Sequence, residues 1–372
     1  MLEVKELKET KETGVKSTTI FGSMSMDQHE QVTFCYDQET GLKAIIAVHN
    51  TILGPALGGT RMWMYKTEAE ALNDVLRLSR GMTYKAAVSG LNLGGGKAVI
   101  IGDSKKEKTE ALFRKFGRFV NNLNGKYITA EDVGTSTREM EYVAMETKHV
   151  TGLPESMGGG GDPSPVTAFG VYMGMKAAAK ETYGSDNLEN KRVVIQGVGH
   201  VGENLVKYLK SENAKVFITD INEEQLRKVS GETGAEVISS EAVYSTPMDI
   251  YAPCALGATL NTENIEQLKC AIVAGAANNQ LADETIHGKM LMEKGIIYAP
   301  DFLINAGGLI NVFFEFKGEY NRDRAMKQTE KIYDLTLSIL KKSKQENIPT
   351  YIAAQQIAER RLADISKVKS TY

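Results

Sequence analysis

Two lysines, Lys85 and Lys97, are the only charged residues between Arg80 and Asp103. They lie in an apolar stretch, and three glycines, 94–96, come directly before Lys97. Burial and a neighbouring ammonium group both lower the pKa of a lysine, so this pattern favours a lysine that acts as a base near neutral pH. The glycines would let a small substrate and a cofactor approach the backbone. The alternative is that both side chains extend to solvent from a hydrophobic helix and strand.

A glycine fingerprint lies in the second half of the chain. Gly197, Gly199 and Gly202 follow the β-branched run 192–196 and precede a predicted helix that reaches about Lys210. In this context the first glycine makes a tight turn, the second lets the backbone approach a pyrophosphate, and the third lets helix and strand pack closely. The N–H groups at the start of the helix would face the phosphates. The pattern predicts a dinucleotide site.

An acidic residue follows the fingerprint at a suitable distance. A second predicted strand, 215–219, ends at Asp220. Its carboxylate is placed to accept hydrogen bonds from the ribose hydroxyls of the adenosine, and it would repel a 2′-phosphate. We therefore predict NAD rather than NADP as the cofactor.

Two later segments, 249–258 and 271–280, each read as a strand that ends in a loop of small residues. Such loops lie at the carboxyl edge of a parallel sheet, where ligands bind. Asn279 could hydrogen-bond a carboxamide or a substrate carboxylate. Alternatively, it is a turn residue bonded to its own backbone.

Short β-branched runs alternate with amphipathic helical patterns in the N-terminal part, which predicts an α/β architecture. Thr67 and Glu70 form a capping-box pattern before a helix that would carry Lys85 near its C-terminal end. Ser136 and Glu139 repeat that pattern before a later helix. The predicted strands are 31–36, 42–49, 98–101 and 127–130, and a further predicted helix is 107–123.

Four consecutive glycines, 158–161, predict a loop between two domains, because such a run would weaken any regular element. The run is also expected to loosen the hinge there. Ser164 is predicted to cap a helix that ends near Tyr183. A long helix, 322–342, and a final helix, 352–365, follow. We expect a substrate domain, 1–152, onto which 346–372 returns, and a cofactor domain, 153–345.

Length and composition indicate a globular chain of two domains, with 372 residues, 42% hydrophobic and 24% charged. A net charge of −3 gives no general attraction to nucleic acid or to an anionic membrane. The first eight residues disperse their charges, and no apolar run is long enough to span a bilayer, so neither a signal peptide nor a membrane segment is expected. Three widely spaced cysteines fit reduced thiols in the cytoplasm, and five single histidines predict no metal site.

Several separate motifs together resemble the amino acid dehydrogenases of the glutamate, leucine, phenylalanine and valine group. These motifs are 57–61, 82–85, 91–97, 129–135, the fingerprint at 197–202, and 275–280, and they occur in the family's order. The resemblance covers about Gln31 to Arg361. It implies an N-terminal α/β substrate domain and a Rossmann-type, doubly wound dinucleotide-binding domain. The implied reaction is NAD-dependent, reversible oxidative deamination of an L-amino acid to a 2-oxo acid and ammonia.

The resemblance also implies roles for individual residues. Lys85 would bind the substrate α-carboxylate, Lys97 would activate the water that attacks the imine, and Asp132 would move protons. Alternatively, Asp132 is only an acid near the start of the helix after Ser136. Gly58 and Asn279 are further expected substrate contacts. The expected cofactor contacts are Thr167, Gly197, Val198, Gly199, His200, Val201, Gly202, Asp220, Cys254, Ala255 and Asn279. The implied assembly is a homo-oligomer, an octamer in the branched-chain type.

Four positions that match the family's side-chain pocket are apolar: Leu57, Ala130, Leu309 and Val312. A distal carboxylate would lie there without a cation, which costs several kcal/mol. Glutamate is therefore disfavoured, whereas leucine, isoleucine and valine are expected substrates in a catabolic deamination, and phenylalanine stays open. Phe313 and Phe314 depart from the branched-chain pattern and are expected to reshape the pocket.

Two other functions compete with this interpretation. A P-loop phosphotransferase fails because Leu91 stands where its first glycine is needed and Ala98 replaces the hydroxyl residue that would hold magnesium. A non-catalytic NAD-binding sensor stays open. Such a protein would have no use for the set of Lys85, Lys97 and Asp132.

Overall fold

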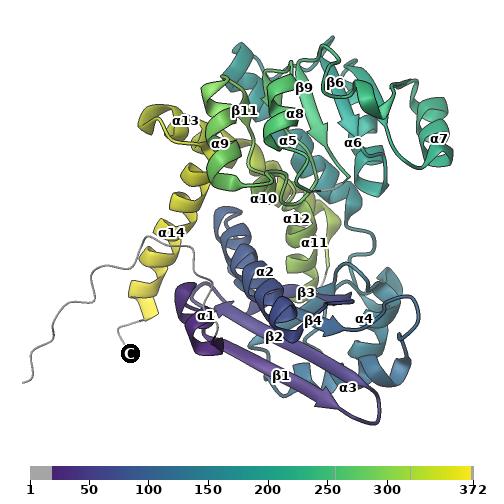
Figure 1. Cartoon of the computed structure of the whole chain (residues 1–372), viewed down its shortest axis with the longest axis vertical. Helices are drawn as coiled ribbons and strands as arrows, with labels where there is room; N and C mark the ends of the chain where they lie inside the picture. The colour runs from purple at the N-terminus through teal and green to yellow at the C-terminus, as the bar shows by residue number, and fades with distance from the viewer. Residues whose placement is uncertain (1–18, 256, 319, 370–372) are drawn as a thin grey trace, which may run out of the picture.

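The computed structural model describes residues 19–255, 257–318 and 320–369. Figure 1 shows two bodies, each built on one β-sheet, with the N-terminal body below and the second body above. The eight N-terminal residues that argue against a signal peptide lie outside the described residues.

The lower sheet has five strands in the order β1-β2-β4-β3-β5. β1 and β2 pair antiparallel, β2 and β4 pair antiparallel, and β3 is parallel to both β4 and β5. Helix α2 packs on one face of the sheet, and α3 and α4 pack on the other. The strands are β1 (Gln31–Asp37), β2 (Leu42–Asn50), β3 (Ala56–Trp63), β4 (Gly94–Ile101) and β5 (Tyr127–Glu131), and the helices are α1 (Ile20–Met26), α2 (Glu68–Val88), α3 (Glu110–Asn121) and α4 (Thr137–Ala144).

The structure confirms the strands that were predicted at 31–36, 42–49 and 127–130, within one residue at their ends. β3 was missed, because Gly58 and Gly59 dilute the β-branched pattern on which the prediction depended. β4 begins earlier than the predicted 98–101 and includes all three glycines. A Cβ on Gly95 would lie 2.2 Å from the backbone nitrogen of Thr83 in α2, and one on Gly96 would lie 2.6 Å from the Tyr127 ring. Gly95 and Gly96 therefore allow the protein's own helix and strand to pack closely, whereas the approach of a ligand to their backbone stays a prediction.

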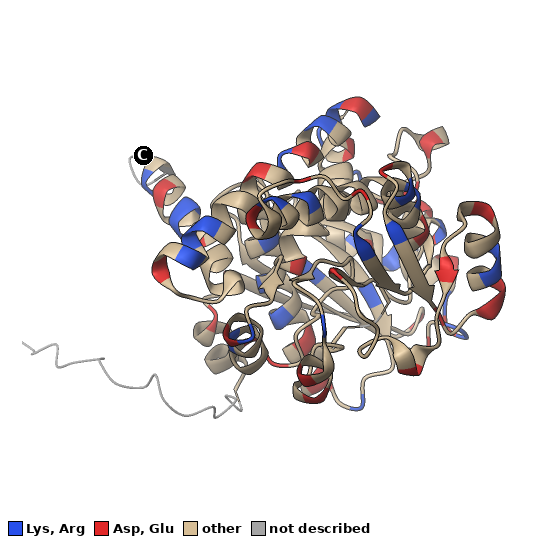
Figure 2. Cartoon of the chain, turned by 90° about the horizontal axis from the view of Figure 1, so that it is seen from above, with Lys and Arg blue, Asp and Glu red and all other residues tan. Residues whose placement is uncertain are grey.

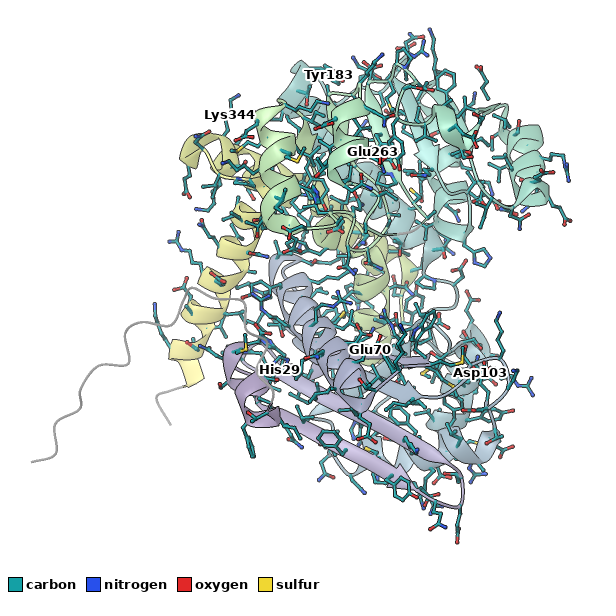
Figure 3. The ribbon with its side chains drawn as sticks, in the orientation of Figure 1. His29, Glu70, Asp103, Tyr183, Glu263 and Lys344 are labelled. Atoms are coloured by element: carbon teal, nitrogen blue, oxygen red, sulfur yellow. The ribbon has the colours of Figure 1, made fainter. Side chains whose placement is uncertain are left out.

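Capping fixes the helices of the lower body. Thr67 Oγ1 accepts a hydrogen bond from the N–H of Glu70 (3.1 Å), but the Glu70 carboxylate bonds the N–H of Lys66 and not that of Thr67. Glu70 is labelled at the start of α2 in Figure 3. The predicted capping box of Ser136 and Glu139 is complete at the start of α4. Lys85 lies in the last turn of α2, as predicted.

The upper sheet has six parallel strands in the order β11-β10-β9-β6-β7-β8. Buried residues of α5 and α6 pack on one face, and those of α8 and α9 pack on the other. This arrangement confirms a doubly wound, Rossmann-type sheet and the predicted strands 192–196 and 215–219. The strands are β6 (Arg192–Gln196), β7 (Lys215–Thr219), β8 (Glu236–Val237), β9 (Ile250–Pro253), β10 (Ile272–Val273) and β11 (Ile297–Tyr298), and the helices are α5 (Ser164–Tyr183), α6 (His200–Ser211), α7 (Glu223–Thr233), α8 (Thr262–Gln267) and α9 (Glu284–Glu293).

The segment between the two bodies is a loop, as predicted, but the glycine run is tightly packed. The N–H of Gly160 donates to the Glu315 carboxylate (3.1 Å), and a Cβ on Gly160 would lie 2.5 Å from Nδ2 of Asn311. The expectation of a loosened hinge is therefore wrong for this residue. Pro163 is the N-cap of α5 and the Asp162 carboxylate accepts from the N–H of Ser164 (2.9 Å), so Ser164 is the first helical residue and not the cap.

The C-terminal helices return to the lower body. The helix predicted over 322–342 is two helices that part at Lys331, whose N–H bonds the carbonyl of Gln328 in a tighter turn. Arg361 of α14 donates hydrogen bonds to the carbonyls of Ala87 (3.0 Å) and Leu91 (2.8 Å), at the C-terminal end of α2. The last helix thereby fixes the end of the helix that carries Lys85. The helices are α10 (Asp301–Ile304), α11 (Gly307–Phe316), α12 (Arg322–Glu330), α13 (Ile332–Glu346) and α14 (Thr350–Lys369).

Acidic and basic residues are interspersed along the helices in Figure 2. Among the described residues, no helix is both long and apolar enough to cross a membrane. Within the same part of the chain, no three His, Cys, Asp or Glu side chains gather as a metal site.

Candidate active site

Lys97 lies in the middle of β4 and is only 5% exposed. Its Nζ is 3.0 Å from Oδ2 of Asp132, which directly follows β5. Burial lowers the pKa of Lys97 below its ordinary value, although Asp132 opposes this change. Burial also opposes the charge of Asp132, but Lys97 and Arg61 together hold its pKa below the usual value. The sequence showed no carboxylate beside Lys97, and the fold supplies one.

Arg61 completes this cluster. From β3, its Nε donates to the same Asp132 oxygen (3.0 Å), and its Nη1 donates to Asp74 of α2 (3.0 Å). Arg61 is the cation whose charge lowers the pKa of Lys97. This corrects the expectation that Lys85 does so. Sequence reasoning placed Arg61 in a motif but gave it no role, and a charged residue within a strand was the available signal.

Asp132 is not an acid of the first turn of a helix. α4 begins at Thr137, and Ser136 and Glu139 satisfy its first N–H groups. The backbone N–H of Asp132 donates to Oγ1 of Thr135 (2.9 Å), which fixes the turn that aims the carboxylate at Lys97. The alternative interpretation of Asp132 is therefore wrong.

Lys85 is partly buried, and its Nζ donates to Oδ1 of Asn305 (2.6 Å). Burial lowers the pKa of Lys85 to about 8; Asp301 raises it and the charge of Lys97 lowers it. Asn305 follows α10, and its Nδ2 donates to Oδ1 of Asn278 (2.8 Å). Lys85 of the lower body is therefore linked to the loop after β10 of the upper sheet. Sequence reasoning missed Asn305, which follows a helix of only four residues.

The predicted side-chain pocket residues come from three elements. Leu57 of β3 and Leu309 of α11 belong to one buried cluster, and Val312 packs against it together with Phe313 and Phe314. The rings of Phe313 and Phe314 meet edge to face at 5.5 Å. The predicted pocket residues Leu57, Leu309 and Val312 thus belong to, or pack against, the same apolar core, as do Phe313 and Phe314.

Gly58 and Ala130 lie on the neighbouring strands β3 and β5. Ala130 is 7% exposed and pairs with Gly59. A Cβ on Gly58 would lie 1.7 Å from the carbonyl oxygen of Gly96 in β4. Gly58 is therefore required for β3 and β4 to approach, whatever its contact with a substrate.

The fingerprint loop has the predicted backbone geometry. Gly197 has a φ of +103°, which favours glycine, and a Cβ on Gly202 would lie 2.1 Å from the Gly197 carbonyl oxygen. Gly199 is the N-cap of α6, and a Cβ there would meet open space. The next residues, His200 and Val201, begin α6 and point its first N–H groups out of the sheet edge.

Asp220 lies beside this loop. Its Oδ2 accepts from the N–H of Val198 (2.7 Å), and its Oδ1 accepts from the N–H of Asn222 (2.8 Å). Ala255 contacts the same turn, since a Cβ on Gly197 would lie 2.6 Å from its Cβ. Four of the predicted cofactor positions therefore share one edge of the upper sheet: Val198, Asp220, Cys254 and Ala255.

The remaining two cofactor positions lie on other elements. Thr167 is in the first turn of α5, where its Oγ1 donates to the Pro163 carbonyl (3.0 Å). Asn279 is exposed and has a φ of +52°, and its carbonyl oxygen accepts from the N–H of Ala258 (2.7 Å). The positive φ is typical of a turn residue, but the carbonyl bonds Ala258 and not its own neighbours, so both interpretations of the Asn279 side chain stay open; the neighbouring Asn278 provides the side-chain link to Asn305.

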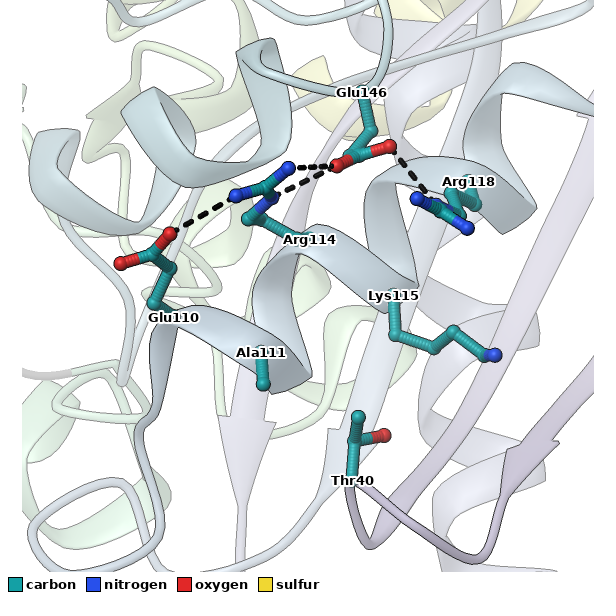
Figure 4. Close-up of a pocket in the computed structure, with 7 residues that line it drawn as sticks. All are labelled: Thr40, Glu110, Ala111, Arg114, Lys115, Arg118 and Glu146. Atoms are coloured by element: carbon teal, nitrogen blue, oxygen red, sulfur yellow. Dashed lines mark hydrogen bonds and ion pairs between the residues drawn. The ribbon is translucent and has the colours of Figure 1, made fainter.

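Two surface pockets lie on the lower body, away from the fingerprint. One, of about 460 Å³, is lined by α3 and its neighbours (Figure 4). Its basic side chains are already paired with carboxylates: Arg114 and Arg118 with Glu146, and Lys115 with Asp37. It therefore offers a ligand little free charge. The other pocket, of about 570 Å³, is lined by Arg61, Trp63, Tyr65, Glu70, Asn73, Asp74, Arg77 and Val133.

Two family models match the chain. One, described as "Glu/Leu/Phe/Val dehydrogenase, dimerisation domain", matches residues 27–149. The other, described as "Glutamate/Leucine/Phenylalanine/Valine dehydrogenase", matches residues 158–222 and 217–369. The two matches together cover most of the chain.

Individual relatives match over a similar length. The chain is 57% identical over 353 residues to leucine dehydrogenase from Thermoactinomyces intermedius, covering 95% of this chain and 96% of that protein. It is 47% identical over 369 residues to phenylalanine dehydrogenase from Bacillus thermotolerans, covering 98% and 96%. Among solved structures, L-tryptophan dehydrogenase from Nostoc punctiforme superposes with a TM-score of 0.84 at 44% identity, covering 93% of this chain and 99% of that one.

Proposed function

Because the chain belongs to the Glu/Leu/Phe/Val dehydrogenase family and is an amino acid dehydrogenase, we propose that its substrates are branched-chain L-amino acids. The proposed reaction is NAD-dependent, reversible oxidative deamination to a 2-oxo acid and ammonia. The observation that carries the proposal is the buried contact of Lys97 with Asp132, close enough to Lys85 for the charge of Lys97 to lower the pKa of Lys85.

The fingerprint edge fits a dinucleotide. The space beside Gly199 is open, the first turn of α6 presents N–H groups, and Asp220 is fixed next to the fingerprint turn, which supports the proposal that it binds a ribose. When bound, NAD accepts the hydride that leaves Cα of the amino acid. Two features support the NAD assignment: the charge of Asp220 and the family.

We assign the chemistry at the substrate to three side chains. Lys85 would bind the α-carboxylate as a cation, in the orientation that Asn305 gives its Nζ. Loss of hydride makes Cα an imine carbon, and a water adds to it while Lys97 takes one of the water's protons. Asp132 would pass the proton taken by Lys97 to the departing nitrogen; ammonia then leaves as the C–N bond breaks, and the hydroxyl gives its proton to the now neutral Lys97 as the C=O bond forms. Burial favours the neutral form of Lys97 that this step needs.

Apolar side chains support the choice of substrate. Leu57 and Leu309 are buried, Val312 packs against their cluster, and Ala130 lies on the next strand. A glutamate side chain would place an unpaired carboxylate against this surface, at a cost of several kcal/mol. The difference between leucine and valine is one methylene, worth about 1–3 kcal/mol, so both remain substrates.

Activity on a panel of amino acids tests this proposal. We expect NADH production with leucine, isoleucine and valine, and a kcat/KM for glutamate at least about 100-fold lower, because an unpaired carboxylate costs more than 2.7 kcal/mol. Phenylalanine is the informative competitor, because Phe313 and Phe314 border the same cluster. A kcat/KM for glutamate or phenylalanine that equals or exceeds the value for leucine would contradict the branched-chain assignment.

The cofactor preference has its own test. Replacing Asp220 with serine should raise kcat/KM for NADP relative to NAD by about tenfold or more, because the carboxylate no longer repels a 2′-phosphate. Asp220→Asn is the matched control for the backbone contacts, since its amide oxygen can still accept from the N–H of Val198. If the charge of Asp220 causes the preference for NAD over NADP, both variants should weaken that preference. A pair of variants as strict as the parent would place the ribose site elsewhere.

We extend the proposal to the organisation of the enzyme. Residues 1–152, with 346–372, would form the substrate part and 153–345 the cofactor part, a division close to the boundary between the matched family models. The dimerisation domain in the family description supports a homo-oligomer, and we propose an octamer. Three cysteines without a disulfide support a reducing, cytoplasmic location.

A further inference from the structure

We propose that Arg61, held by Asp74, is a positioning residue that fixes the Asp132 carboxylate against Lys97 and balances its charge. This inference rests on the proposed function, in which Lys97 is the base. Neither the fingerprint nor the pair of lysines points to Arg61 or Asp74. The inference comes instead from the geometry of the Arg61 guanidinium group, which contacts both Asp132 and Asp74.

The guanidinium of Arg61 bridges two carboxylates from different elements. Its Nε contacts Oδ2 of Asp132 and its Nη1 contacts Oδ2 of Asp74, both at 3.0 Å. Lys97 contacts the same Asp132 oxygen at 3.0 Å. Among the described residues no hydrogen-bond donor reaches Oδ1, so two cations hold one oxygen and leave the other for a reacting group.

Asp74 is itself fixed by two donors besides Arg61. Its Oδ2 accepts from the hydroxyl of Tyr65 (2.7 Å), and its Oδ1 accepts from Nη2 of Arg77 (2.9 Å). These residues line the pocket of about 570 Å³ on the lower body, which gives solvent access to the outer end of the chain of contacts. Asp74 of α2 therefore holds the Arg61 side chain in place, and Arg61 in turn holds the Asp132 carboxylate.

Apart from the exposed Arg77, the charges in this chain of contacts are balanced, with two cations facing two carboxylates. Protonated Lys97 and Arg61 face Asp132 and Asp74, with Arg77 at the solvent side of Asp74. Removing Arg61 would leave two carboxylates acting on Lys97 and would raise its pKa. Removing the charge of Asp74 would leave Arg61 less neutralised and would lower the pKa of Lys97.

Other titratable groups near Lys97 do not change this balance. From α2, Lys85 is a further cation whose own pKa responds to Lys97 and Asp132. From β2, burial lowers the pKa of His49 to about 4, so it is neutral near pH 7. From β5, burial raises the pKa of Tyr127, which is also neutral. From the end of β3, burial and the Asp74 carboxylate raise the pKa of Tyr65.

The pH dependence of kcat/KM for leucine oxidation tests the inference in the full-length enzyme. Activity falls at low pH because the base must be unprotonated. In Arg61→Gln we expect this acid limb to move to higher pH by about one unit, and in Asp74→Asn to lower pH, since a neighbouring charge commonly shifts a pKa by this amount. Arg61→Lys should recover part of the shift. A substitution that only damaged the local structure would not be expected to move the acid limb in opposite directions in these two variants.

A second measurement separates this inference from the proposed function. The rate at which a small amine-directed reagent modifies Lys97, measured by mass spectrometry of its peptide over a pH series, reports the pKa of Lys97 without substrate. Exposed Lys43 in β2 is the control for reagent and pH. Opposite shifts in labelling support the positioning role. If they occur without matching shifts in activity, the inference stands and Lys97 is not the base. The inference would be overturned if the pH dependence of Lys97 labelling were unchanged in both variants, or moved in the same direction in both. If Arg61→Gln does not fold, the shift of Lys97 labelling in Asp74→Asn alone tests the inference.

Discussion

In the Lys97→Ala variant, kcat for amino acid oxidation is expected to fall by about 10²-fold or more, because general base catalysis contributes a factor of about 10²–10⁴. The fold should persist: Asp132 retains its hydrogen bond to Arg61 and is not left as an unpaired carboxylate. NAD binding should be unchanged, because the fingerprint and Asp220 belong to the other sheet. Steady-state kinetics gives kcat, and calorimetric titration of the variant with NAD gives the dissociation constant.

Lys43→Ala is a matched control for this result. Lys43 is also a strand lysine of the lower sheet, but it is exposed and lies on β2. Its loss should leave kcat and the affinity for NAD as they are in the parent. If Lys97→Ala keeps the parental kcat, or if both variants lose activity equally, Lys97 has no chemical role and the proposed mechanism fails.

Local patterns predicted the geometry of the fingerprint loop in the upper sheet well. Gly197, Gly202 and Asp220 act within a single strand-turn-helix unit, where spacing along the chain determines spacing in the structure. Lys97, the proposed base in the lower sheet, could also be singled out from the sequence, because an isolated lysine in an apolar strand is unusual. Its acidic partner was recognised only by family resemblance, since Asp132 reaches Lys97 from a strand that is not its neighbour in the sheet.

Contacts between elements that are far apart along the chain could not be predicted from the sequence. Arg61 and Asp74 meet only because α2 packs over the sheet to which β3 belongs, and β3 itself was hidden by its glycines. Asn305 contacts Lys85 across the two bodies, and nothing in the four-residue helix before it indicates that contact. The packing role of the glycines before Lys97 was hidden for the same reason, since the neighbours they admit, Thr83 and Tyr127, belong to other elements.

In the Lys85→Met variant, kcat/KM for leucine is expected to fall by about 10²–10³-fold, because leaving one charge of a buried pair without its partner costs about 2–5 kcal/mol. Lys85 Nζ is already oriented by Asn305, so the lysine can meet a carboxylate with little rearrangement. Methionine fills much of the same volume without the charge. Part of the loss should appear in kcat, since binding and alignment depend on the same contact.

Leucinamide shows whether the lost contact is to the α-carboxylate. The parent should prefer leucine over leucinamide, because Lys85 pairs with a carboxylate and not with a neutral amide. In Lys85→Met this preference should nearly disappear, with kcat/KM for leucinamide much less affected than that for leucine. If kcat/KM falls to the same extent for leucine and leucinamide in Lys85→Met, Lys85 does not contact the α-carboxylate. Only a direct contact with the carboxylate makes the effect of the substitution depend on the charge of the substrate.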